Sequence, residues 1–143
     1  MSKVIIVGYG VVGKNMRKEL DKLNPVVYDK KMNERPEQRK FEFGFICVDT
    51  PLKDGRLDTS QVELAIAEND CGVYVVKSTV PVGWTEQMVE KTGKRIVVNP
   101  EYYGETQHCL NYNFDFTILG GDKKTCIEVI QLMQEVYDAR HTY

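Results

Sequence analysis

The chain has 143 residues, of which 42% are hydrophobic and 28% charged, and its formal net charge is −2. This length suits one globular domain with a real core, and we treat residues 1–143 as a single compact domain. No apolar run approaches the roughly 20 residues of a membrane helix, and no basic face or signal peptide is evident, so we expect a cytoplasmic protein that binds neither membranes nor nucleic acid.

Short apolar runs alternate with segments that have helical spacing. In chain order we expect a strand at 3–7, a helix at 11–23, strands at 26–28 and 43–48, a helix at 60–68, a strand at 73–76, a helix at 84–91, strands at 95–98 and 116–119, and a helix at 122–137. The strands are apolar throughout rather than alternating, which is typical of a parallel sheet covered by helices on both faces.

This alternation predicts an α/β fold, a Rossmann-type doubly wound parallel sheet with strand order 3-2-1-4-5-6. One connection is shorter than the common pattern. The segment between the second and third strands is polar and contains Pro36. We therefore expect no full crossover helix there.

The first strand ends in Gly8-Tyr9-Gly10-Val11-Val12-Gly13, a G-x-G-x-x-G pattern between a strand and an amphipathic helix. Gly8 allows a tight turn, Gly10 lets a pyrophosphate approach the backbone, and Gly13 lets the helix pack on the strand. A plain strand-to-helix turn is the alternative to a dinucleotide site.

Asp29 ends the second strand, about 20 residues after the first glycine. At this position of dinucleotide-binding folds, an acidic side chain accepts a hydrogen bond from the ribose 2′-hydroxyl. A carboxylate there repels a 2′-phosphate and favours NAD over NADP. Lys30 and Lys31 follow at once and weaken this preference. With Asp29 in place, we expect residues 8–13 to bind NAD.

Four cysteines occur, without C-x-x-C spacing and with only two histidines in the chain, so we expect no metal site and no disulfide. Cys47 and Cys71 lie in or beside strand-like segments. We expect both to be buried small hydrophobes.

Four further segments follow in order: Phe45-Ile-Cys-Val-Asp-Thr-Pro51, Lys77-Ser-Thr-Val-Pro-Val-Gly83, Asn99-Pro-Glu-Tyr-Tyr103 and Ile118-Leu-Gly-Gly-Asp122. Together they resemble the NAD-binding domain of the UDP-glucose/GDP-mannose dehydrogenase family, and Lys77–Gly83 is the most specific of them. Each segment alone could be an ordinary strand-terminating turn. All four follow strands, at the edge where open parallel sheets bind ligands.

The resemblance implies NAD as cofactor and a nucleotide sugar, such as UDP-glucose, as the substrate whose C6 alcohol becomes a carboxylate. It implies cofactor contacts by Val48, Asp49 and Thr50 on the adenosine side, and by Ser78, Thr79, Val80 and Glu105 near the nicotinamide. It implies catalytic roles for Thr79, which would hold a water or the substrate oxygen, and for Glu101, which would assist as a base. The sugar nucleotide would lie against Glu101, Tyr102, Tyr103, Gly104 and Glu105.

Other family features are missing from these residues. None of the four cysteines has the Gly-Gly-x-Cys context of the family's nucleophile, although Cys109 lies beside His108. We expect the central helix and the substrate domain to be absent, and the chain alone to be inactive. A standalone NAD-sensing module is the alternative.

The sequence leaves a homodimer open. The last helix would normally pack on the absent region of the family. Met133 and Val136 are therefore candidates for an exposed apolar patch through which two chains could associate.

Overall fold

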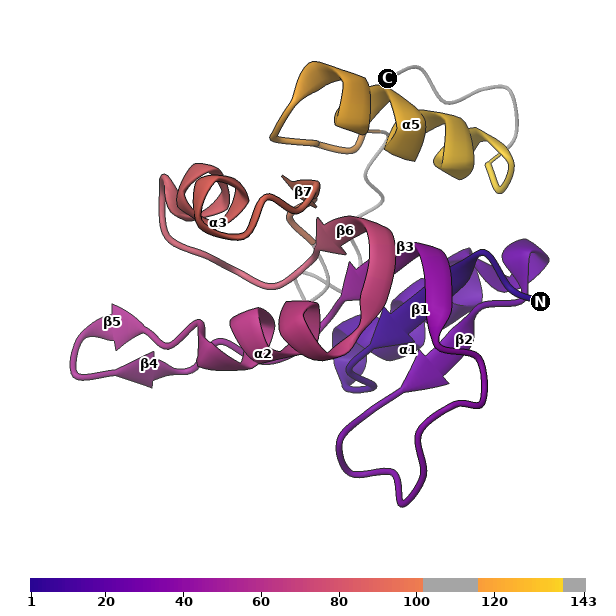
Figure 1. Ribbon diagram of the computed structural model, residues 1–143, viewed down its shortest axis with the longest axis horizontal. Helices are drawn as coiled ribbons and strands as arrows, with labels where there is room; N and C mark the ends of the chain where they lie inside the picture. The colour runs from indigo at the N-terminus through magenta and orange to yellow at the C-terminus, as the bar shows by residue number, and fades with distance from the viewer. Residues whose placement is uncertain (102–115, 138–143) are drawn as a thin grey trace.

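The computed structural model describes residues 1–101 and 116–137. The elements along the chain are β1 (Val4–Val7), α1 (Val11–Glu19), the short 3-10 helix η1 (Asp21–Leu23), β2 (Val26–Tyr28), β3 (Lys40–Ile46), β4 (Leu52–Lys53), β5 (Arg56–Leu57), α2 (Ser60–Glu68), β6 (Asp70–Val76), α3 (Trp84–Thr92), β7 (Ile96–Val98) and α5 (Lys123–Gln134). Figure 1 shows their arrangement in space.

Five strands form one parallel sheet in the order β2-β1-β3-β6-β7. Helices α1 and α5 pack on one face of this sheet, where Met16, Leu20 and Leu132 join the buried side chains of the strands. Helices α2 and α3 cover the other face through residues such as Ile66 and Trp84. The Rossmann-like, doubly wound α/β fold is therefore confirmed.

The expected strand order is wrong. We expected the third strand to lie outside the second, but β3 instead pairs with β1, from Val4 beside Phe43 to Val7 beside Ile46. The connection at residues 29–39 contains no helix, as expected, so it has no covering layer with which to build an outer strand. The resulting order is that of flavodoxin-like sheets, and its switch point lies between β1 and β3.

Two further elements differ from expectation. Residues 116–119 form no strand, and the next residue, Gly120, pairs with Val98 of β7 as an isolated antiparallel bridge. The β4–β5 hairpin was not expected and projects from the body at the left of Figure 1. Its turn is Asp54-Gly55, both with positive φ, which is the strongest short-range hairpin signal a sequence carries.

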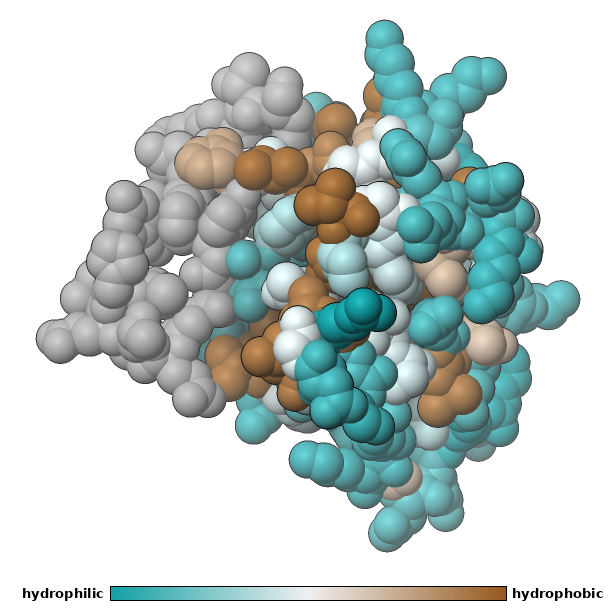
Figure 2. Space-filling view, turned by 90° about the vertical axis from the view of Figure 1, so that its left-hand side faces the viewer, coloured by the Kyte–Doolittle hydropathy of each residue, from teal (hydrophilic) through white to brown (hydrophobic). Residues whose placement is uncertain are grey.

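The surface beside this hairpin is mostly hydrophilic. Figure 2 looks at the molecule from that side and shows polar side chains over much of the described surface, with hydrophobic residues between them. Leu52 and Val82 are among the exposed apolar residues of the chain. Met133 and Val136 are not: both are buried, at 3% and 8% exposure, so the expected apolar patch on the last helix is wrong.

Candidate functional site

The turn after β1 is held by backbone contacts. Gly8 has a φ of +96°, and its N–H donates to the carbonyl of Tyr28 at 2.8 Å. A Cβ on Gly8 would lie 2.7 Å from the carbonyl oxygen of Cys47. The turn is therefore wedged between the ends of β2 and β3, and only glycine fits there.

Gly10 and Gly13 have opposite surroundings. A Cβ on Gly13 would lie 2.0 Å from the carbonyl oxygen of Gly8, so Gly13 is needed for α1 to pack on the turn. A Cβ on Gly10 would meet no atom within 4 Å. Gly10 is the N-cap of α1 and makes no side-chain cap, and the first turn of α1 holds no acidic residue. The helix start therefore leaves its N–H groups open to an anion.

Asp29 lies beside this turn. Its Oδ2 accepts from the backbone N–H of Tyr9 at 2.8 Å, and its Oδ1 accepts from that of Lys31 at 2.9 Å. The hydrogen bond from Lys31 is the largest influence that lowers the pKa of Asp29, so the carboxylate is ionised at neutral pH. Each oxygen keeps a second lone pair for a ligand.

A cavity of about 340 Å³ opens between the ends of β1, β2 and β3 and helix α2. It therefore lies at the switch point of the sheet, where open α/β sheets bind ligands. Its lining comprises Val7, Gly8, Tyr9, Gly10, Tyr28, Asp29, Lys30, Lys31, Met32, Cys47, Val48, Asp49, Gln61, Leu64, Ala65, Glu68 and Asn69.

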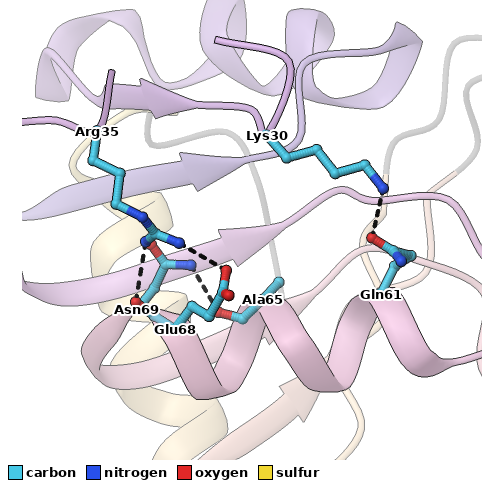
Figure 3. Close-up of polar contacts among 6 residues, drawn as sticks. All are labelled: Lys30, Arg35, Gln61, Ala65, Glu68 and Asn69. Atoms are coloured by element: carbon cyan, nitrogen blue, oxygen red, sulfur yellow. Dashed lines mark hydrogen bonds and ion pairs between the residues drawn. The ribbon is translucent and has the colours of Figure 1, made fainter. Parts of the chain in front are cut away.

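Two polar contacts tie the segment after β2 to α2 (Figure 3). The Lys30 ammonium donates to Gln61 Oε1 at 2.8 Å. Further along, Arg35 donates to the Glu68 carboxylate at 2.7 Å and to its backbone carbonyl at 3.3 Å. The Arg35 guanidinium also lies 4.7 Å from the ring centroid of Tyr28. These contacts connect the helix-free segment at 29–39 to α2.

The ends of β6 and β7 carry a separate buried polar cluster. Lys77 is 6% exposed, and its ammonium donates to Asn99 Oδ1 at 2.8 Å. The Asn99 amide donates in turn to Thr117 Oγ1 at 2.9 Å and to the carbonyl of Ile118 at 2.7 Å. Burial lowers the pKa of Lys77. Burial also raises the pKa of Glu101, against the opposing charge of Lys77.

Ser78 turns inward at the same edge. Its hydroxyl donates to the carbonyl of Val48 at 2.6 Å, which ties the end of β6 to the end of β3. Thr79 is exposed and Val80 is half-buried. Thr79 is therefore available to a ligand lying over this edge.

Residues 18–141, most of the chain, match the model of the UDP-glucose/GDP-mannose dehydrogenase family, NAD binding domain. The chain belongs to this family. The match begins inside α1, after the glycine turn, so the geometry of residues 8–13 is an independent observation. NAD, the cofactor expected from the sequence, is confirmed as the cofactor of the matching domain.

Two similar proteins are much longer than this chain. The chain is 32% identical over 105 residues to an uncharacterized protein of Methanocaldococcus jannaschii, a match that covers 65% of this chain and 12% of that protein. The structure of UDP-D-ManNAc dehydrogenase from Pyrococcus horikoshii superimposes with a TM-score of 0.59 and 25% identity, over 87% of this chain and 33% of that one. The chain thus spans a third or less of these two relatives.

A protein of Arthrobacter sp. FB24 assigned as an F420-dependent NADP-reductase superimposes with a TM-score of 0.60 over 95% of this chain and 81% of that one. Its identity is 16%, so this likeness shows the fold alone.

The cofactor residues expected from the sequence fall into two groups. Those that line the cavity are Gly8, Tyr9, Gly10, Asp29, Val48 and Asp49. Those that do not are Val11, Val12, Gly13, Thr50, Ser78, Thr79 and Val80. Glu101 is half-buried beside the Lys77 cluster, while Tyr102, Tyr103, Gly104, Glu105 and Cys109 lie outside the described residues.

Sequence reasoning missed the α2 wall of the cavity, formed by Gln61, Leu64, Ala65, Glu68 and Asn69. The helical spacing of these residues was the available signal, because positions three and four apart share one face. It could be used only with the position of β3 known, since β3 brings α2 next to β1.

The described cysteines all have raised thiol pKa values. Cys47 and Cys71 are buried, as expected, and burial raises the pKa of each thiol to about 12. The pKa of Cys126 is also raised by burial. At neutral pH these three side chains are thiols, and a thiol reacts far more slowly than a thiolate.

Among the described residues, no helix is long and apolar enough to cross a membrane.

Proposed function

We propose that this chain is the NAD-binding part of a dehydrogenase that oxidises the C6 alcohol of a nucleotide sugar to a carboxylate. The family supplies the reaction class, and the cavity at the switch point supports a place for the cofactor. The single observation that carries the proposal is the open start of α1: Gly10 faces empty space at the rim of this cavity, with uncapped N–H groups behind it.

The cofactor would lie with its pyrophosphate at residues 8–13 and its adenosine ribose at Asp29. A ribose hydroxyl can donate to either oxygen of Asp29, because each still has a free lone pair. NAD would accept the hydride from the sugar carbon. Thr79 would then lie on the nicotinamide side, together with Ser78 and Val80, and Glu105 would belong to the same side.

Oxidation of an alcohol to a carboxylate consumes two NAD and one water, and it releases two NADH and three protons. Glu101 suits the step that activates water, because burial raises the pKa of its carboxyl and makes it a better base. The sugar would lie against residues 101–105.

We also propose that the nucleophile is not within the described residues. A thioester route needs an accessible thiolate, and Cys47, Cys71 and Cys126 all have raised pKa values. None of the four cysteines has the Gly-Gly-x-Cys context of the family's nucleophile, so we expect these 143 residues to bind NAD but to complete no turnover alone. The standalone NAD-sensing module makes the same binding prediction and differs only in turnover.

Calorimetric titration with NAD and NADP tests the cofactor site. We expect NAD to bind more tightly than NADP, and the Gly10→Asp variant to lose binding because a carboxylate would occupy the pyrophosphate position. A folded wild-type chain that binds neither nucleotide would refute the proposal.

A turnover assay with UDP-glucose and UDP-N-acetylmannosamine tests the enzyme part. The chain should reduce NAD only when mixed with the cysteine-containing portion of a family member. Failure of several such mixtures, with NAD binding intact, would favour the sensing module.

A further inference from the structure

The cavity extends well past Asp29, and its far end has its own chemistry. Gln61 and Glu68 both line it from α2, and seven residues of helix span about 10 Å. This inference rests on the proposed function. With the pyrophosphate at Gly10 and the ribose at Asp29, the base of the dinucleotide continues along α2 toward Glu68.

The middle of this path is apolar. Leu64 and Ala65 line it from α2, and Met32 lines it from the segment after β2. Leu64 and Met32 are partly exposed, at 47% and 40%. A flat aromatic base that enters between α2 and this segment would cover both side chains and gain hydrophobic free energy.

Glu68 is held in place at the far end. Its Oε2 accepts from Arg35 at 2.7 Å (Figure 3). The Arg35 guanidinium also lies over the ring of Tyr28. Among the hydrogen bonds of the described residues, none is donated to Glu68 Oε1. A fixed carboxylate oxygen with free lone pairs therefore belongs to the cavity lining.

Asn69 adds a second acceptor. It is 8% exposed, and its amide N–H donates to the carbonyl of Ala65 at 2.8 Å. Its Oδ1 receives no hydrogen bond from any described residue, although Asn69 lines the cavity. A buried acceptor without a donor is costly, so this atom favours a ligand that brings an N–H.

We propose that Glu68 and Asn69 select adenine as the base of the dinucleotide. The 6-amino group of adenine has two N–H donors, one for Glu68 Oε1 and one for Asn69 Oδ1. A 6-oxo purine places a carbonyl at this position, so acceptor faces acceptor and both protein atoms lose their donor. The site therefore binds hypoxanthine and guanine dinucleotides more weakly than NAD.

The test compares NAD with nicotinamide hypoxanthine dinucleotide, which differs at the 6-position of the base. By calorimetry we expect wild type to bind the hypoxanthine compound about tenfold more weakly, a modest factor because the Glu68 side chain is 44% exposed. In Glu68→Gln the preference should fall below about threefold, because the new amide can donate to the 6-carbonyl.

Glu63→Gln is the matched control. Glu63 lies on the same helix and pairs with Lys91 at 3.6 Å, but it does not line the cavity, so its variant should keep the wild-type preference. Equal binding of both dinucleotides to wild type, or an unchanged preference in Glu68→Gln, overturns the inference while the proposed function stands. Binding of neither dinucleotide overturns both.

Discussion

The two halves of the sheet's carboxyl edge are shaped by different parts of the chain, one by backbone contacts and the other by buried side chains. At β1–β3 the shape comes from backbone: Gly8 and Gly13 allow contacts that any Cβ would block, and a cavity remains. At β6–β7 it comes from buried side chains, with Lys77 and Asn99 filling the interior. The first half is organised around an open space, and the second around a filled polar interior.

This difference predicts how each half fails. Substitutions in the backbone-built half should separate sharply into those that prevent packing and those that only block the ligand. Substitutions in the side-chain-built half should change stability and its pH dependence together, because buried charge is part of the structure.

The largest expected effect is that of Gly13→Ala. Its Cβ would lie 2.0 Å from the carbonyl oxygen of Gly8, so α1 must move away, at a cost of more than about 3 kcal/mol in unfolding free energy. Gly10→Ala meets nothing within 4 Å and should stay within about 0.5 kcal/mol of wild type while NAD binding weakens. Urea denaturation checks both, and equal losses of stability would contradict the contrast.

Asn99→Ala should come next, with a loss of about 2–3 kcal/mol, because it removes three hydrogen bonds and leaves the Lys77 ammonium without its acceptor. Lys77 has a lowered pKa in the folded state, so the unfolded chain binds more protons between that pKa and 10.5, and stability rises with pH in this window. The deficit of the variant should therefore shrink at alkaline pH. Denaturation at pH 7 and pH 10 measures it, and a deficit that grows would refute the buried-charge interpretation.

Asp29→Asn should have a smaller effect, mainly on cofactor choice. The preference for NAD over NADP should fall about tenfold, because the repulsion of a 2′-phosphate is removed. The amide that replaces the carboxylate can keep only one of the two backbone hydrogen bonds, so a thermal melt must accompany the titration. An unchanged NAD-to-NADP ratio in a folded variant would mean that Lys30 and Lys31 set the choice instead.

The subtlest effect concerns Glu101. Lys77 holds the pKa of Glu101 down against burial, so Lys77→Met should raise that pKa further. A carboxyl whose folded pKa lies above its unfolded value contributes stability below pH 4.5 and loses it as pH rises through the folded pKa. NMR titration of the Glu101 carboxyl carbon measures this pKa. An unaltered pKa in Lys77→Met would mean that Lys77 does not influence Glu101.

The sequence predicts the backbone-built half well and the side-chain-built half poorly. The glycine pattern and Asp29 are local signals, and the structure brings them together at the cavity. The β2 and α2 boundaries agree with expectation because their apolar spacing is local too. In the sequence, Lys77 is recognisable only as the first residue of the Lys77–Gly83 segment. Nothing near it indicates that Asn99, 22 residues later, accepts its hydrogen bond.

The strand order could not be predicted because it depends on a layer that is missing. Apolar strands are equivalent in composition, and their neighbours are decided by which connections carry covering helices. The segment at 29–39 is too short and polar for one. The pairing of β3 with β1 therefore follows from the lack of a covering helix in this segment. Local sequence patterns indicate such a lack only weakly.

Because no described strand lies outside β2, β2 is an edge strand of the sheet. Among the described strands, β2 pairs only with β1, so one side of its backbone has no ladder partner. Exposed edge strands can pair with strands of other chains, which leads to aggregation. Here the edge strand spans only Val26–Tyr28, directly after Pro25 and directly before Asp29, Lys30 and Lys31. A strand this short between a proline and a charged run gives a second chain little to pair with, so the shortened fold also limits its own aggregation.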